Sequence, residues 1–311
     1  MARRRVAWVV AAWPGMAAVG QMATAYLHDA LRMEQLVEFG ANGFFAPESI
    51  RVEKGLVLPG RRPRSVISTW NGGPAGRDLL LVQGEQQPAF DSMRYARSLL
   101  DACSAREVER VVTIASLATA IDPTEESRVF AACSTEALLE SVMLVPGVQP
   151  LEDAEVSGMN GEFLAAARER GIPAMCLLGE IPFFATNLPN PKASAAALAA
   201  LRYMLGIDLP LEGLLEQARR IEGWILKQLD TSSTRDKSDR SARVLETTAG
   251  LSDAALTTAA EQVDLIQRIE GMFALALQDR DKAKDLKAEL DRHGLFREYE
   301  DRFLDMFRKG S

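Results

Sequence analysis

The sequence is poor in the residue types on which most metal sites and many active sites depend. It has only two histidines, His28 and His293, which excludes most histidine-based metal sites and leaves few geometries for a catalytic triad. Its three cysteines, Cys103, Cys133 and Cys176, are an odd number and show no CxxC spacing. Such thiols are typical of small buried side chains in a reducing compartment. We therefore expect a cytoplasmic protein without a metal ion.

Net positive charge and long apolar runs are also missing. The chain has 36 Lys and Arg residues against 43 Asp and Glu, a formal net charge of −7, so no basic field favours nucleic acid. No run of about 20 apolar residues occurs, which argues against a membrane span. Arg3–Arg5 and the apolar residues 6–12 imitate a signal peptide, but the run ends at Pro14-Gly15. We favour a buried first strand, which accounts for the same residues.

The 311 residues are 47% hydrophobic and 25% charged, as in an ordinary globular protein. Short apolar runs predict buried strands, largely parallel, at residues 6–12, 65–69, 79–82, 108–115 and 174–178. Helical patterns lie between them at residues 21–31, 90–102, 161–169 and 193–205, the last with Asn190 as its cap and Pro191 at its start. This alternation predicts an α/β fold, a three-layer α/β/α sandwich. Residues 39–59 suggest antiparallel strands at one sheet edge.

The last third of the chain differs in character. Residues 211–229 have the stripe of an amphipathic helix, and residues 231–241 (TSSTRDKSDRS) contain no apolar side chain. We interpret the latter as a flexible linker. Beyond it, apolar residues again repeat at helical spacing. The predicted organisation is an α/β domain at 1–230, a polar linker at 231–241 and a helical C-terminal extension at 242–311.

The segment after the first strand is a candidate ligand-binding loop. Pro14 and Gly15 begin a turn, and Gly15 and Gly20 have the glycine separation of a phosphate-binding loop. However, Gln21 and Met22 stand where that loop needs Lys and Ser or Thr. We favour a tight strand-to-helix turn in which Gly20 allows close contact between helix and sheet. A helix N-terminus there could still accept an anion.

Polar residues follow three other predicted strands. Glu85, Ser116 and Glu180 come after strand ends, where open α/β sheets bind their ligands, and Asn187 lies close behind Glu180 in the sequence. Two carboxylates on one rim of the sheet could perform acid–base chemistry if their environments separate their pKa values. The alternative, which we favour, is that they cap helices or pair with arginines at a subunit contact.

Several segments together resemble the PAC2 family, which is named after a proteasome assembly chaperone subunit. They are residues 13–20 (WPGMAAVG), 78–88 (DLLLVQGEQQP), 110–113 (RVVT), 178–187 (LGEIPFFATN) and 190–193 (NPKA). The resemblance covers residues 6–226. It implies a fold related to purine nucleoside phosphorylases, with a C-terminal helical extension in bacterial members, and it brings no activity with it. It also implies oligomers that act as assembly chaperones or proteasome binders.

Our first hypothesis is thus a non-catalytic homo-oligomer, from dimer to trimer or tetramer, that binds or assembles a protein partner without a cofactor. The C-terminal hydrophobic-Tyr-any tripeptide by which such relatives dock on the proteasome is replaced here by Lys309-Gly310-Ser311, so docking by that route is not expected. The alternative is an enzyme or ligand-binding protein that takes a nucleoside or a small anion at the strand-end rim. A third hypothesis is partner binding by the helical tail alone.

Overall fold

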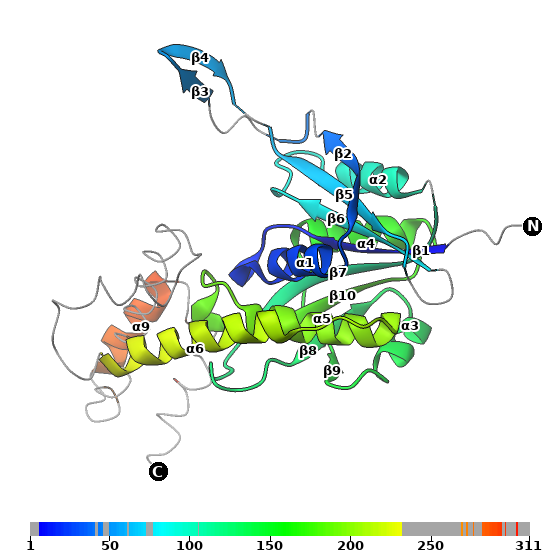
Figure 1. Cartoon of the computed structure of the whole chain (residues 1–311). Helices are drawn as coiled ribbons and strands as arrows, with labels where there is room; N and C mark the ends of the chain where they lie inside the picture. The colour runs from blue at the N-terminus through cyan, green and yellow to red at the C-terminus, as the bar shows by residue number, and fades with distance from the viewer. Residues whose placement is uncertain are drawn as a thin grey trace, which may run out of the picture. The chain divides into compact units, whose positions relative to one another are not determined.

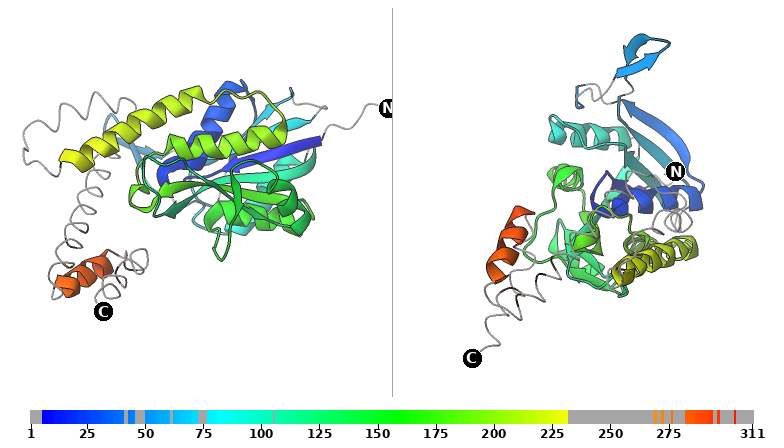
Figure 2. Two further views of the ribbon diagram at one scale, coloured as in Figure 1. Left: turned by 90° about the horizontal axis from the view of Figure 1, so that it is seen from below. Right: turned by 90° about the vertical axis from the view of Figure 1, so that its left-hand side faces the viewer.

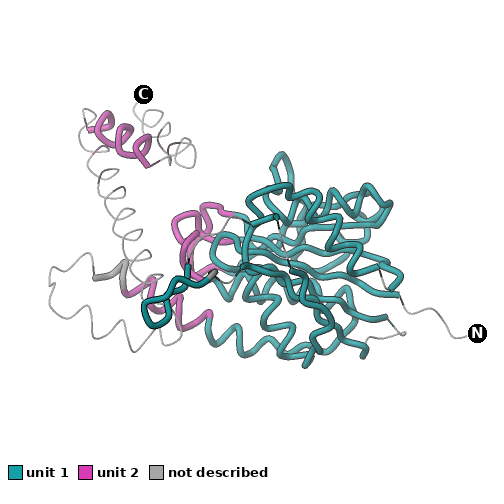
Figure 3. The backbone as a smooth tube through the Cα atoms, turned by 90° about the horizontal axis from the view of Figure 1, so that it is seen from above, with its two compact units in different colours: residues 1–117, 126–180, 190–217 teal, residues 118–125, 181–189, 218–311 magenta. Residues whose placement is uncertain are grey.

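A computed structural model describes residues 6–40, 43–45, 50–60, 62–72, 77–104, 106–231, 269, 272, 276, 282–293, 296 and 303. The chain divides into two compact units (Figure 3). The first consists of Met1–Leu117, Glu126–Glu180 and Asn190–Gln217, and the second of Ala118–Glu125, Ile181–Pro189 and Ala218–Ser311. No helix among the described residues is both long enough and apolar enough to cross a membrane.

The first unit is built on a sheet of eight strands in the order β2-β5-β6-β1-β7-β10-β8-β9 (Figure 1). The strands are β1 (Val6–Ala12), β2 (Glu34–Gly40), β5 (Arg64–Trp70), β6 (Asp78–Gly84), β7 (Glu107–Thr119), β8 (Val129–Cys133), β9 (Val148–Pro150) and β10 (Ala174–Pro182). The strand β1 lies in the middle and pairs in parallel with β6 and β7. Its burial is nearly complete, as its continuous apolar sequence predicts.

The sheet is mixed, and the expectation of a largely parallel sheet is wrong in this respect. The pairs β2–β5, β5–β6 and β8–β10 are antiparallel, whereas β8 and β9 are parallel. The link from Trp70 to Asp78 is short. Such a link can join antiparallel neighbours, whereas a parallel pair needs a crossover of a dozen or more residues.

Helices cover both faces of this sheet (Figure 2). The helices α2 (Ser92–Cys103) and α4 (Gly158–Glu169) pack together on one face, and α1 (Val19–Ala30) and α5 (Pro191–Leu205) on the other. Asn190 caps α5 as predicted, since its Oδ1 accepts a hydrogen bond from the Ala193 N–H at 2.9 Å. The three-layer α/β/α prediction is confirmed for this unit.

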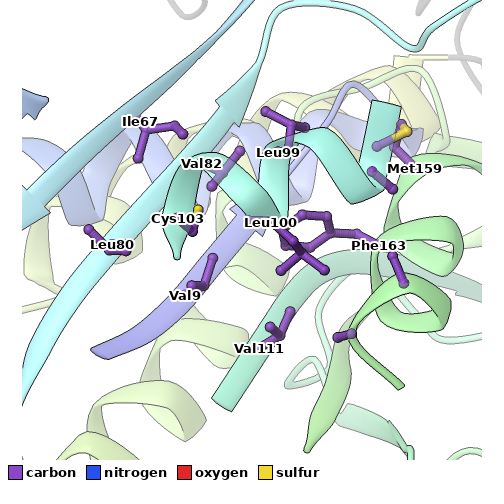
Figure 4. Packing of buried hydrophobic residues seen from close by; sticks show 14 of the residues in the cluster. Val9, Ile67, Leu80, Val82, Leu99, Leu100, Cys103, Val111, Met159 and Phe163 are labelled. Atoms are coloured by element: carbon purple, nitrogen blue, oxygen red, sulfur yellow. The ribbon is translucent and has the colours of Figure 1, made fainter. Parts of the chain in front are cut away.

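One hydrophobic core cluster lies between the sheet and the helices α2 and α4 (Figure 4). Val9, Val82 and Val111 face it from three neighbouring strands, Leu99 comes from α2, and Phe163 comes from α4. Each such side chain, fully buried, stabilises the fold by about 1.5–3 kcal/mol relative to an exposed one. This burial fixes which face of each strand points inward. It thereby fixes the pairing of the strands and the positions of the residues near their ends.

Two stretches depart from the expected elements. Within residues 39–59, β3 (Ile50–Glu53) and β4 (Leu56–Pro59) form a separate two-stranded sheet, whereas the edge strand is β2, which begins earlier at Glu34. The elements β8, α3 (Glu136–Val142) and β9 were not predicted. Thr135 caps α3 by accepting a hydrogen bond from the Leu138 N–H.

Two apolar clusters lie among the described residues of the second unit. One joins Trp224 and Ile225 of α6 (Glu212–Thr231) to Ala185 and Leu188. The other contains α9 (Ala283–Arg292) and is made up of Ile269, Ala276, Ala283, Leu286, Leu290 and Phe303. Thr231, the first residue of the predicted linker, is the last residue of α6, and the rest of that linker lies outside the described residues. The predicted extension at 242–311 is described only in part.

The three cysteines are free thiols. Burial raises the pKa of Cys103 and Cys176 to about 12 and that of Cys133 to about 11. At pH 8 the thiolate fraction of Cys133 is therefore roughly two orders of magnitude below that of a free thiol. We expect a thiol reagent to modify the native protein slowly at pH 8, and all three cysteines quickly in denaturant. Fast modification of one thiol in the native protein would contradict this expectation.

Candidate functional site

The loop that follows β1 has an unusual backbone. It contains the short 3-10 helix η1 (Met16–Ala18), and both Ala17 and Ala18 have left-handed conformations, with φ of 52° and 50°. A left-handed alanine costs roughly 1–2 kcal/mol. Two in succession persist only where the surrounding structure over-determines them, and such strain is concentrated at functional sites.

Three hydrogen bonds from distant segments hold this loop. The Gln87 side-chain amide donates to the Pro14 carbonyl at 2.8 Å, and the Ser116 hydroxyl donates to the Met16 carbonyl at 2.9 Å. The Asn190 backbone N–H donates to the Ala17 carbonyl at 2.9 Å. The loop is thus fixed by the segment after β6, by β7 and by the start of α5.

Gln87 also connects the loop to α4. Its Oε1 accepts a hydrogen bond from the Met159 N–H at 2.9 Å, while its amide nitrogen binds Pro14. One side chain therefore links the loop after β1 to the N-terminus of a helix on the sheet. Sequence reasoning selected Glu85 in this segment and missed Gln87. Gln87 could have been found from its position just beyond the end of β6, but Glu85 has the same position, so position alone does not separate the two.

Gly20 lies where α1 approaches the sheet most closely. A Cβ atom at this position would be 2.3 Å from the carbonyl oxygen of Ile114 and 3.0 Å from the Cβ of Ala12. No other residue fits at this distance without movement of helix or strand. The favoured interpretation of Gly20, close contact between helix and sheet, is confirmed, and this contact accounts for the glycine without a bound phosphate.

The carboxylate of Glu85 is bound by an arginine of the same unit. Arg64 donates through its Nε to Glu85 Oε1 at 3.1 Å and also binds Glu38. The pKa of the Arg64 guanidinium is raised, chiefly by the hydrogen bond to Glu85. Since the side chains of Arg64 and Glu85 are each about one-third exposed, water screens the pair and it adds little to stability.

Glu180 forms a different kind of pair. It lies inside β10 with its side chain fully buried, and it accepts a hydrogen bond from Arg128 Nε at 2.7 Å. A second guanidinium nitrogen, Nη2, binds the other carboxylate oxygen, and the Arg128 backbone N–H donates to the same side chain at 3.3 Å. The arginine side chain is half exposed. This geometry is bidentate, which favours a fixed structural pair.

The structure brings together some of the predicted site residues. Pro14 and Gly15 belong to the loop after β1, Gly20 lies in the first turn of α1, and Ser116 binds that loop directly. Ser116 and Glu180 lie within β7 and β10 because these strands extend to Thr119 and Pro182, beyond the predicted ends. Glu85 follows β6 and binds Arg64.

Asn187 belongs to the second unit, where its side chain is exposed. Within the described part of the chain, no group of three or more His, Cys, Asp or Glu side chains could hold a metal ion. The exposed side chain of the loop after β1 is Met16, at 45%. A thioether suits contact with another apolar surface better than proton transfer.

Comparison with known proteins agrees with this fold. The profile of the PAC2 family matches residues 9–229. The chain has 23% identity to PbaB, a proteasome activator from the archaeon Pyrococcus furiosus, with a TM-score of 0.62 over 74% of this chain and 96% of that one. A proteasome-assembly chaperone homologue of Mycobacterium tuberculosis has 23% identity and a TM-score of 0.61 over 77% and 99% of the two chains.

A PAC2 family protein of Streptomyces avermitilis has 22% identity to this chain and a TM-score of 0.59, over 78% of this chain and 99% of that one. No curated protein matches the sequence. At these identities the solved structures establish the fold, and the profile, which spans more than half of the sequence, establishes the family. The chain belongs to the PAC2 family.

Proposed function

We propose that this protein is a cytoplasmic, non-catalytic, homo-oligomeric PAC2 protein that binds and assembles a protein partner. The observation that carries the proposal is the PAC2 match over residues 9–229. The structural relatives add support, because they include a proteasome activator and proteasome-assembly chaperone homologues.

The polar groups at the rim support the same proposal. Glu85 and Glu180 are bound by different arginines, and Ser116 donates its hydroxyl proton to a backbone carbonyl. A general base must be within reach of the proton that it abstracts, and a nucleophile needs a base that accepts its proton. In this arrangement the same groups hold the loop and the strands in place.

Native mass spectrometry of the freshly purified full-length protein tests the proposal. We expect a discrete homo-oligomer, between dimer and tetramer, whose mass is an integer multiple of the chain mass. Affinity capture from the producing cells should then recover free or partly assembled subunits of a larger complex in preference to the finished complex. A protein that remains monomeric at low micromolar concentration contradicts the proposal.

A second candidate function is ligand binding at the loop after β1. The left-handed Ala17 and Ala18 favour it, because backbone strain is concentrated at ligand sites, and so does Trp13 Nε1, a buried donor without a hydrogen bond among the described residues. The ligand in this case is a nucleoside or a small anion, the ligand classes of the alternative hypothesis in the sequence analysis. A reproducible additional mass on each subunit in the same spectra would favour this function over the first.

A further inference from the structure

The two-stranded sheet formed by β3 and β4 presents one apolar face. The strands pair antiparallel, with Ile50 opposite Pro59 and Val52 opposite Val57, around a turn at Lys54-Gly55. Residues opposite each other in an antiparallel pair share a face. The first face therefore carries Ile50, Val52 and Val57, and the second carries Arg51, Glu53, Leu56 and Leu58.

This apolar face is open to solvent. Ile50, Val52 and Val57 are 64%, 59% and 66% exposed, and the sheet hydrogen-bonds to no strand of the eight-stranded sheet. Each of its strands has four residues. A two-stranded hairpin is marginally stable in water, whereas three or more strands with an apolar face are stable. The hairpin thus lacks a further strand within the described part of the chain.

We infer that a second copy of this chain supplies the missing strands, through antiparallel pairing of β3 with β3 of the partner copy around a two-fold axis at Val52. This inference rests on the proposed homo-oligomer and names its contact. A two-fold contact uses the same patch on both copies. The result is a four-stranded sheet in the order β4-β3-β3-β4, with Ile50, Val52 and Val57 of both copies on one face.

The outer edge of β3 suits such pairing better than that of β4. Strand β4 ends at Pro59, and proline has no N–H to donate to a neighbouring strand. Strand β3 has the sequence Ile-Arg-Val-Glu, in which every residue has an N–H and a carbonyl.

Charge then selects one register. A two-fold axis between residues would place Ile50 or Val52 opposite a charged side chain of the partner and would mix the two faces. An axis at Arg51 would place two arginines opposite each other, and an axis at Glu53 would do the same with two glutamates. An axis at Val52 places Arg51 opposite Glu53 of the other copy, twice. Opposite charges stabilise cross-strand pairs, and like charges destabilise them.

Within one copy Arg51 Nη1 and Glu53 Oε1 are 3.2 Å apart, so both side chains already lie on the same face. Both are more than half exposed. They are therefore available to a partner strand without any rearrangement of the core. The pairing of Arg51 with Glu53 and the shared face of Ile50 and Val52 therefore favour the same register.

Charge exchange tests this contact on the full-length protein. Arg51→Glu alone places two glutamates opposite each other across the contact, and Glu53→Arg alone places two arginines opposite each other. We expect each variant to weaken self-association by roughly 10-fold or more in analytical ultracentrifugation, since two attractive pairs become repulsive. An equimolar mixture of the two variants should restore it, because every cross-strand pair then has opposite charges. A mixture as weak as the single variants would overturn the inference.

Cysteine crosslinking tests the register. In a Cys133→Ser background, Val52→Cys should form a disulfide-linked dimer under mild oxidation, because directly opposite Cβ atoms are about 4.5–5.5 Å apart. Val57→Cys is the matched control: it lies on the same face and is similarly exposed, but three strand spacings, roughly 14 Å, would separate the two copies. Equal crosslinking of both variants would indicate stacked hairpins and overturn the inference.

The outcomes separate this inference from the proposed function. If the native protein is oligomeric and the charge variants associate equally well, the β3 contact is wrong and the proposed homo-oligomer stands. The same holds if the variants keep their self-association and lose only the binding of a different protein. If the native protein is monomeric, both are wrong. Because the exchanged residues are exposed and do not belong to the buried core, we expect unchanged unfolding curves, which excludes misfolding as the cause.

Discussion

Arg128→Ala is expected to lower the free energy of unfolding by about 3–5 kcal/mol, because it leaves the buried carboxylate of Glu180 without its guanidinium partner. The fully buried side chain of Glu180 would lose both guanidinium hydrogen bonds. Burial of a charge is costly when its partners are removed. Urea unfolding of the full-length variant, followed by far-UV circular dichroism, measures the change.

The reverse substitution should cost less. In Glu180→Gln the buried side chain keeps its shape and loses its charge, while the half-exposed Arg128 remains accessible to water. We expect a loss of roughly 1–3 kcal/mol, as for a hydrogen bond to a charged group. The double variant Arg128→Ala/Glu180→Gln should be more stable than Arg128→Ala alone, because it buries no carboxylate. Equal effects of the two single substitutions would show that the asymmetry in burial has no energetic consequence.

Gly20→Ala is expected to destabilise the protein by about 1–3 kcal/mol through overpacking. Its new Cβ would meet the Ile114 carbonyl oxygen at 2.3 Å, and this oxygen belongs to the central strand β7. Backbone atoms cannot rotate away as a side chain can, so α1 must move from the sheet. The same unfolding measurement reports the effect.

Gly223→Ala is the matched control for Gly20→Ala. Gly223 also lies in a helix, α6, and a Cβ atom there would have no heavy atom within 4 Å. Since alanine is favoured over glycine in a helix interior by about 1 kcal/mol, we expect equal or greater stability. A Gly20→Ala protein that is as stable as Gly223→Ala would contradict the close contact between α1 and β7.

The central sheet could be predicted from the sequence because its strands are continuous apolar runs. The run at Val6–Ala12 coincides with β1, and Asn190-Pro191 marks the start of α5. Strand β9 was missed because it has three residues, two of them exposed, so it has neither the length nor the apolar pattern of a buried strand. The alternation of residues along a segment predicts a strand, but it does not say with which other strand that segment pairs. The separate sheet of β3 and β4 could therefore not be predicted.

The site could be predicted only in outline. Position beyond a strand end located the loop after β1 and the segment with Glu85 and Gln87. It did not distinguish the glutamate, which binds Arg64, from the glutamine, which binds the loop. Nothing in the sequence indicates the left-handed Ala17 and Ala18, because alanine has no preference for that conformation. The tertiary hydrogen bonds to their loop impose it.

The place of the β3–β4 hairpin in the chain has a consequence for the diversification of this protein. The hairpin lies in the sequence between β2 and β5, and these two strands pair with Gly40 opposite Arg64. The ends of the insertion are therefore held side by side by the sheet itself, where changes of length are tolerated best. We expect the hairpin, residues 50–59, to be exchangeable for a short turn without loss of the sheet, whereas Phe44 must be kept because its side chain is buried against Tyr95 in the core. Contacts with a partner can then be changed in this hairpin while the eight-stranded sheet stays the same.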